Sequence, residues 1–355
     1  MTGPIDQTAA VRPGEELNLE AIRRYLAEAA PELKGEFSLE QFPAGHSNLT
    51  YLLKVGGREY VLRRPPFGSK VRTAHDMGRE YRIFQALHPV YNKVPRPVAF
   101  CEDESVIGAR FYVMERIQGV ILRRQVPPEV DFSPAVADRL CESFVKNLAD
   151  LHALDYRAAG LGEMGKPEGY LKRQLDGWAE RYQGSRTDDI PEITGVIAWL
   201  KENLPASPAP SLIHNDYKYD NIILDPEDIT KIVGVLDWEM STIGDPLSDL
   251  GQALGYWVQA DDPQELKDQA FGPTYAPGSW TRRRLAERYA ALTGRDISNI
   301  HYYTCLATFK IAVIIQQIYF RFNQGLTRDA RFGPLIDMVK LLSRVGDELI
   351  QRGEI

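Results

Sequence analysis

One polar loop near the middle of the chain lies between two apolar runs. The segment 211–224 has apolar residues near both ends, Leu212-Ile213 and Ile222–Leu224. Its centre carries four side chains suited to chemistry: His214, Asp216, Lys218 and Asn221. A second apolar run follows and ends at Asp237. Because short strands on a rigid scaffold often present functional loops, this segment predicts a fold that holds these polar side chains close together.

Residue types at this spacing are typical of phosphoryl transfer from Mg-ATP. Asp216 can orient a hydroxyl group and accept its proton, while Lys218 can neutralise the γ-phosphoryl group. Asn221 and Asp237 offer the oxygen ligands that Mg²⁺ prefers. We assign His214 to support of the loop by hydrogen bonding. The alternative is a surface turn in which Asp and Asn cap their own backbone, but it does not account for the whole set.

Composition limits the partners and the compartment. The chain has 355 residues, 44% of them hydrophobic, so it can bury a large core and form two lobes. A net charge of −7 argues against nucleic acid as the main partner. The three cysteines are widely spaced and odd in number, which favours reduced packing residues over disulfides or metal ligands. The polar N-terminus lacks a secretory signal, and Leu306–Phe320 is too short to span a bilayer, so we expect a soluble cytoplasmic protein with no membrane partner.

The first third of the chain is rich in strand patterns. Residues 1–16 show no periodicity and predict a flexible tail, and an amphipathic helix is expected over 18–30. Strand-like runs occupy Phe37–Phe42, Leu49–Val55, Glu59–Arg63, Pro97–Cys101 and Arg110–Glu115. Gly56-Gly57 predicts a hairpin between the second and third runs. A further helix is expected over Thr73–Leu87.

After Gly119 the pattern becomes mainly helical. Ser133-Pro134 is a helix start, and that helix is expected to reach His152. Further helices are expected near 169–183, 190–203, 246–259, 281–293, 299–322 and 334–351. The sequence therefore predicts an α+β fold with two lobes. The N-lobe, 17–117, has an antiparallel sheet and one helix and binds the nucleotide, and the helical C-lobe, 118–355, carries the catalytic loop and substrate-binding helices.

The motif His-x-Asp-x-x-x-x-Asn at 214–221, followed by Asp-Trp-Glu at 237–239, resembles the aminoglycoside phosphotransferase-like branch of the protein-kinase-like superfamily. The stretch 37–251 supports this resemblance. Within the branch, Gly45–Tyr51, Tyr60–Pro66 and Leu236–Pro246 are similar to the kinase-like domain that is fused ahead of acyl-CoA dehydrogenases in some eukaryotic proteins. The resemblance implies a two-lobed protein-kinase-like fold that uses ATP and Mg²⁺.

The same resemblance implies which residues contact the ATP phosphates. Ser47 and Asn48 lie in the expected phosphate turn, which has one glycine where protein kinases have G-x-G-x-x-G. Arg63 stands where protein kinases carry a lysine on the third strand, and arginine can also grip phosphate oxygens. Glu80, on the following helix, is the expected ion-pair partner of Arg63.

The segment 113–117 is expected to form the hinge between the lobes. Its backbone would bind the adenine edge, and Met114, Glu115 and Ile117 are the candidate contacts. Asp245 is expected to cap a helix and steady the catalytic loop.

Together, the residues and the resemblance predict a kinase that acts on a hydroxyl group of a small molecule. The resemblance to the dehydrogenase-fused domain implies a hydroxyacyl group or its CoA thioester as the acceptor. Aminoglycosides and amino alcohols stay open as alternatives, although no acidic run follows the catalytic loop to attract a polycation. A nucleotide-binding pseudokinase or scaffold is a second hypothesis, because Arg63 replaces lysine and the phosphate turn has one glycine.

Overall fold

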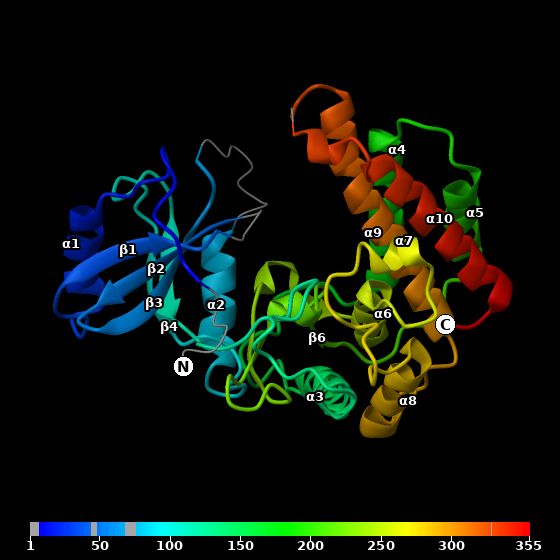
Figure 1. Cartoon of the computed structure of the whole chain (residues 1–355), viewed down its shortest axis with the longest axis horizontal. Helices are drawn as coiled ribbons and strands as arrows, with labels where there is room; N and C mark the ends of the chain where they lie inside the picture. The colour runs from blue at the N-terminus through cyan, green and yellow to red at the C-terminus, as the bar shows by residue number, and fades with distance from the viewer. Residues whose placement is uncertain (1–6, 44–47, 68–75, 328) are drawn as a thin grey trace.

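The N-terminal lobe consists of a five-stranded antiparallel sheet with a helix on each side (Figure 1). The computed structural model describes residues 7–43, 48–67, 76–327 and 329–355. The strands are β1 (Phe37–Gln41), β2 (Leu49–Val55), β3 (Arg58–Arg64), β4 (Pro97–Cys101) and β5 (Phe111–Glu115), in the spatial order β1-β2-β3-β5-β4. The hairpin at Gly56-Gly57 is confirmed, since both glycines have positive φ and Val55 pairs with Arg58.

The two faces of this sheet bury different helices. α1 (Leu19–Ala29) covers one face through Ile22 and Leu26, which confirms the amphipathic helix that we expected over 18–30. α2 (Met77–Leu87) packs on the other face, which is continuous with the core of the C-terminal lobe. Part of the predicted tail also lies against the sheet, where Ala9 pairs with Gln41.

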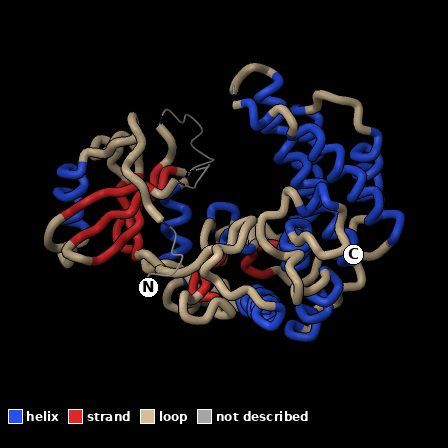
Figure 2. Tube along the Cα trace, in the orientation of Figure 1, coloured by secondary structure: helices blue, strands red, loops and turns tan. Residues whose placement is uncertain are grey.

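The C-terminal lobe is mainly helical, as predicted. Its helices are α3 (Pro134–His152), α4 (Tyr170–Ser185), α5 (Pro191–Glu202), α6 (Pro246–Tyr256), α7 (Gln264–Lys267), α8 (Arg282–Thr293), α9 (Ile300–Asn323) and α10 (Leu335–Arg352). Its strands form two short antiparallel pairs: β6 (Ser211–Ile213) with β9 (Thr242–Gly244), and β7 (Ile222–Leu224) with β8 (Ile232–Val235). Figure 2 shows these short strands between the N-terminal sheet and the helices.

α9 is the central helix of this lobe. It packs against α4, α5, α6 and α10. By length and composition alone it could cross a membrane, but 56% of its most apolar window is buried inside the protein. We therefore interpret it as a core helix. Its close approach to α6 depends on Gly251, because a Cβ there would lie 2.7 Å from the backbone of Tyr303.

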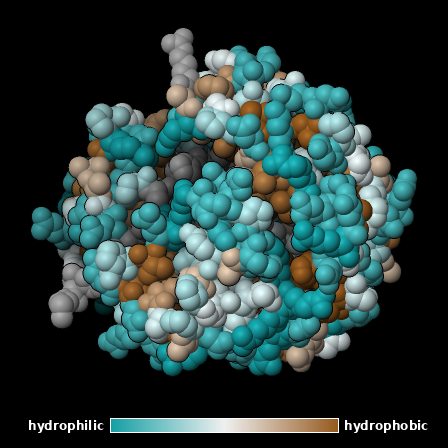
Figure 3. Space-filling view, turned by 45° about the vertical axis from the view of Figure 1, so that its right-hand side comes forward, coloured by the Kyte–Doolittle hydropathy of each residue, from teal (hydrophilic) through white to brown (hydrophobic). Residues whose placement is uncertain are grey.

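The lobes are tied together by backbone and side-chain hydrogen bonds. The N–H of Val235 donates to the carbonyl of Lys93, and Val120, just after the hinge segment, exchanges two backbone hydrogen bonds with Leu224. Arg79, on α2, donates to the carbonyl oxygens of Glu239 and Ser241, and so holds α2 against the segment that follows β8. The face drawn in Figure 3 is mostly hydrophilic, with several separate hydrophobic areas.

Candidate active site

The two short strand pairs hold the predicted catalytic loop. β6 leads into the loop and β7 leaves it, while β8 ends just before Asp237. Asn215 and Asp237 both have positive φ, at 67° and 63°. Non-glycine residues rarely adopt this conformation, and they cluster at functional sites where the surrounding structure enforces it. The unusual backbone conformations therefore indicate a functional site in the same region as the sequence motif.

Asp249, on α6, fixes the start of the catalytic loop through hydrogen bonds to its backbone. It is fully buried, and its carboxylate accepts hydrogen bonds from the backbone N–H groups of His214 (2.7 Å) and Asn215 (2.6 Å). His152 contacts the same carboxylate at 3.1 Å. Burial opposes the charge of Asp249, but these hydrogen bonds hold its pKa below the usual range. This carboxylate directly anchors the catalytic loop.

His214 and Asp245 lie in supporting positions. The imidazole Nε2 of His214 lies 2.9 Å from the carbonyl oxygen of Leu236, which links the loop to the residue before Asp237. Asp245 is the N-cap of α6 and accepts a hydrogen bond from the N–H of Leu247 at 2.9 Å. Tyr303 also donates its hydroxyl to Asp245 at 3.0 Å. Neither side chain points to a reacting group.

Asp216, Lys218 and Asn221 form one polar cluster. The Lys218 ammonium lies 3.0 Å from Asp216 Oδ2, and Asn221 Nδ2 donates to the same oxygen at 2.7 Å. Burial disfavours the charge of Lys218, but the carboxylates of Asp216 and Asp220 raise its pKa above the ordinary value. Lys218 therefore stays cationic, and Asp216 is oriented from two sides.

An ion-pair network links the N-terminal lobe to Asp237. Arg63 donates from Nη1 to Glu80 at 2.7 Å, and its Nη2 lies 3.6 Å from Asp237 Oδ1. Tyr112 donates its hydroxyl to the other Glu80 oxygen at 2.7 Å. Burial raises the pKa of Glu80. Burial also opposes the charge of Arg63, but Glu80, Tyr112 and Asp237 raise its pKa well above the ordinary value, so arginine supplies a permanent cation here.

Two oxygen atoms in this region are available to a metal ion. Asp237 Oδ1 is buried and accepts no hydrogen bond from the described residues, since the Arg63 Nη2 lies 3.6 Å away, beyond hydrogen-bond distance. Asn221 uses its Nδ2 for both of its hydrogen bonds to Asp216, which leaves the amide oxygen for another role. The described residues contain no cluster of three His, Cys, Asp or Glu side chains that forms a metal cage. Two protein ligands fit Mg²⁺, which keeps several waters and takes its remaining ligands from phosphates.

The other predicted nucleotide contacts are only partly assembled. Ser47 lies outside the described residues, whereas the amide of Asn48 donates to Glu239 at 3.2 Å, beside the Asp237 segment. Met114 is buried, and Ile117 packs near Gly234 of β8. Glu115 instead directs its carboxylate to Arg96 at 2.7 Å and donates its N–H to the same residue. Met114 and Ile117 therefore lie nearer to the other lobe than the Glu115 side chain does.

Tyr256 and Phe271 are site residues that the sequence did not single out. The Tyr256 hydroxyl lies within hydrogen-bonding reach of Asp216, and burial raises its pKa well above the ordinary value. The Lys218 ammonium lies 4.7 Å from the Tyr256 ring centroid and 5.1 Å from that of Phe271. These contacts form an aromatic wall beside the catalytic loop. Tyr256 lies in the last turn of α6, the helix that also carries Asp249. Its place on this helix is the one feature that could have pointed to it as a site residue.

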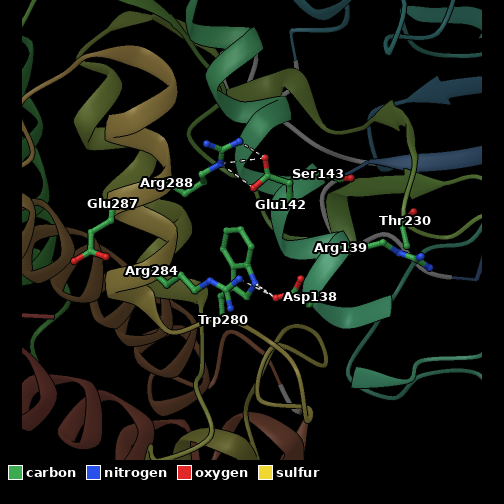
Figure 4. A pocket seen from close by; sticks show the side chains of 9 residues that line it. All are labelled: Asp138, Arg139, Glu142, Ser143, Thr230, Trp280, Arg284, Glu287 and Arg288. Atoms are coloured by element: carbon green, nitrogen blue, oxygen red, sulfur yellow. Dashed lines mark hydrogen bonds and ion pairs between the residues drawn. The ribbon is translucent and has the colours of Figure 1, made fainter. Parts of the chain in front are cut away.

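A separate hollow of about 750 Å³ lies between α3 and α8 (Figure 4). Two of its arginines are paired with carboxylates that also line the hollow. Arg284 pairs with Asp138 at 2.9 Å, and Arg288 pairs with Glu142 at 2.5 Å. None of its lining residues belongs to the catalytic loop. The basic run that begins at Arg282 is therefore paired with carboxylates rather than open to an anionic substrate.

Comparisons with known proteins identify the family and the fold of this chain. The profile of the phosphotransferase enzyme family matches residues 38–287. Acyl-CoA dehydrogenase family member 11 of Gallus gallus is 35% identical, in an alignment that covers 97% of this chain but 45% of that protein. The chain thus spans less than half the length of this relative.

Two further proteins support the same relationship. Viomycin phosphotransferase of Streptomyces vinaceus is 27% identical, over 57% of this chain and 66% of that protein. A crystal structure from Ralstonia eutropha, of a protein named as an aminoglycoside phosphotransferase candidate, is 32% identical with a TM-score of 0.82. It covers 95% of this chain and 99% of that chain. The predicted kinase-like fold and the predicted resemblance are confirmed.

Proposed function

Because this chain belongs to the phosphotransferase enzyme family, we propose that it transfers the γ-phosphate of ATP to a hydroxyl group of a small molecule. The observation that carries this proposal is the convergence of Asp216, Lys218 and Asn221 on one loop, with Asp237 and Arg63 beside it. Phosphoryl transfer requires mainly positioning and neutralisation of phosphate charge. This cluster supplies groups for both tasks.

In the proposed mechanism Asp216 orients the acceptor hydroxyl and takes its proton. The acceptor oxygen forms a bond to the γ-phosphorus as the bond between that phosphorus and the β–γ bridging oxygen breaks, and ADP leaves. Lys218 and Arg63 neutralise charge on the phosphate oxygens. Asn221 and Asp237 would hold Mg²⁺, which supplies further neutralisation of the phosphates. The proton on Asp216 then passes to solvent.

For the acceptor, we propose a hydroxyacyl group, as a free acid or as a CoA thioester. The support is the relationship to proteins that are named acyl-CoA dehydrogenases, whose sequence aligns with nearly all of this chain. If a kinase-like domain that is joined to an acyl-CoA enzyme phosphorylates an acyl compound, the two domains act on the same class of compound. Aminoglycosides and amino alcohols are the competing acceptors, because a relative is named as a phosphotransferase for viomycin.

The experiment is to follow ADP release with Mg-ATP against hydroxyacyl compounds, aminoglycosides and choline-like alcohols, with GDP release from Mg-GTP as a parallel assay. Asp216→Asn is the test variant, and Asp228→Asn, in the exposed turn after β7, is the matched control. We expect turnover with hydroxyacyl compounds that falls about 10²–10⁴-fold in Asp216→Asn and is unchanged in the control.

Two results would overturn parts of this proposal. Unchanged turnover in Asp216→Asn would contradict the mechanism. Efficient phosphorylation of aminoglycosides with none of hydroxyacyl compounds would contradict the acceptor class. Nucleotide binding without turnover on any acceptor in the panel would favour the pseudokinase hypothesis. Asn221 contacts Asp216, and the N–H of Leu236, the residue before Asp237, donates to the carbonyl of Asn221. This arrangement of three side chains speaks against that hypothesis, because a scaffold does not need all three.

A further inference from the structure

A buried lysine in the C-terminal lobe has no counter-ion among the residues that the structure describes. Lys310 is in the middle of α9 and is only 7% exposed. Among the described residues it makes no hydrogen bond or ion pair, and its ammonium lies 5.6 Å from the ring centroid of Trp178 on α4. Lysine is rarely buried without a partner, because removal of its charge from water is costly. Burial lowers its pKa to about 8, so at neutral pH it remains mostly charged.

Lys310 lies near the catalytic loop. The charges that act on it include Asp216 and Lys218 of the loop and Asp249 of α6. α9 packs against both α4 and α6, and α6 ends at Tyr256, whose hydroxyl reaches Asp216. Lys310 therefore belongs to the region between α4, α6 and the catalytic loop.

The carboxylates near Lys310 already have closer partners. Asp216 is paired with Lys218 at 3.0 Å and accepts a hydrogen bond from Asn221. Asp249 accepts hydrogen bonds from two backbone N–H groups and contacts His152. Neither carboxylate needs Lys310 for its neutralisation. The positive charge of Lys310 is therefore not needed to neutralise these two carboxylates.

Two further donors lie beside Lys310. The guanidinium carbon of Arg181, an exposed residue of α4, lies 4.6 Å from the Trp178 ring centroid, and Arg181 has no ion pair among the described residues. The indole Nε1 of Trp178 is buried without a hydrogen-bond partner. Lys310 and Arg181 thus lie near one aromatic ring, and the N–H group of that ring and the Lys310 ammonium have no acceptor among the described residues. Buried donors of this kind normally have a partner, so the missing acceptor is expected from a ligand.

We propose that Lys310, Trp178 and Arg181 form a subsite of the acceptor pocket that donates hydrogen bonds to the carboxylate or thioester carbonyl oxygen of a hydroxy acid while Asp216 holds its hydroxyl group. This subsite rests on the proposed phosphotransferase function and specifies the second functional group of the acceptor. Lys310 contacts the acceptor oxygen and supplies a charge-assisted hydrogen bond. A polycationic acceptor is disfavoured, because it would meet two cations at this wall.

The test uses the full chain and a positional series of probes: 2-, 3-, 4-, 5- and 6-hydroxyhexanoate, each as the free acid and as its CoA thioester, with 1-hexanol as the uncharged comparison. The test variants are Lys310→Met, which keeps the length of the side chain, and Lys310→Arg, which keeps its charge. Lys172→Met is the matched control, since Lys172 is exposed on α4 and pairs with Asp176. The KM for each probe and for ATP, and kcat, are measured for every variant.

We expect the acceptor KM to rise about 10-fold or more in Lys310→Met, with the KM for ATP unchanged and partial recovery in Lys310→Arg. Preference for the free acids over the thioesters would identify a carboxylate in the subsite, and the reverse preference would identify the thioester carbonyl. An unchanged acceptor KM in Lys310→Met, or equal use of hexanol and hydroxyhexanoates, would overturn the subsite while leaving the kinase intact. A lack of turnover on all probes in the wild type would instead count against the proposed function, and binding of non-hydroxylated hexanoate or hexanoyl-CoA, weakened in Lys310→Met, would still support the subsite.

Discussion

The two sides of the active site treat their charges in opposite ways. On the phosphate side, Arg63 is paired with Glu80 and Asp237, and Lys218 is paired with Asp216. On the acceptor side, Lys310 has no counter-ion among the described residues. A paired cation is held ready in a fixed position, whereas an unpaired buried cation costs stability until a ligand arrives. A buried charge without a partner, more than a charge as such, therefore marks a position where a ligand can bind.

The largest expected effect comes from breaking the paired side. Glu80→Gln leaves the buried guanidinium of Arg63 with only the more distant Asp237, so we expect the free energy of unfolding to fall by about 3 kcal/mol. Denaturant unfolding measures this change, and the KM for ATP should rise with it because Arg63 loses its position. Glu115→Gln is the control, since Glu115 pairs with Arg96 at the surface and should contribute less than about 1 kcal/mol. Equal losses in the two variants would contradict the comparison.

Removal of charge from the unpaired side should have the opposite sign and a smaller size. Lys310→Met removes a buried charge and keeps the bulk of the side chain, so we expect Tm to rise by roughly 2–4 °C even as acceptor binding weakens. The contact with Trp178 and the attraction to Asp216 and Asp249 are lost in this variant. Because the pKa of Lys310 is nevertheless lowered, burial outweighs those attractions. Thermal unfolding beside Lys172→Met measures the effect, and a fall in Tm would show that Lys310 is a structural cation.

The same contrast explains how much of the site the sequence predicted. Groups on the phosphate side are close in sequence or follow strand patterns: the catalytic loop spans 214–221, and Arg63 lies on a strand that the hairpin glycines fix. Local spacing and alternation were therefore enough to place Asp216, Asn221 and Asp237 near one another. Arg64 follows Arg63 on β3 and lies on the opposite face of the sheet, as strand geometry requires.

The acceptor side could not be predicted in this way. Trp178, Tyr256 and Lys310 come from three helices, and only the packing of α4, α6 and α9 brings them toward the catalytic loop. In the sequence, each fits an ordinary helix pattern. The one local signal is Lys310 itself, a charge inside the apolar run of α9. Such a residue is costly in a core unless it has a role, so it marks a functional candidate.

The smallest expected effect is a change in the stability difference between wild type and Lys310→Met as pH rises. The groups around Lys310 are Asp216 and Lys218 from the loop, Asp249 from α6 and Arg181 from α4. Below pH 8 Lys310 is protonated in both the folded and unfolded chains, so the folded wild type bears the full cost of the buried charge. Between its folded pKa of about 8 and its ordinary value of 10.5, the folded chain releases the proton first, and wild-type stability rises relative to the variant.

The gain in Tm of Lys310→Met over wild type should therefore shrink between pH 8 and about pH 10, while other titrations cancel because both proteins share them. Over the same range the wild-type KM for a hydroxy acid should increase, since the subsite loses its charge, and the KM of Lys310→Met should stay flat. Parallel unfolding scans and kinetic assays at half-unit pH steps measure both trends. A constant Tm difference across this range would mean that Lys310 keeps its charge through a partner. The unpaired side of the site would then be paired after all, and the contrast with Arg63 would fail.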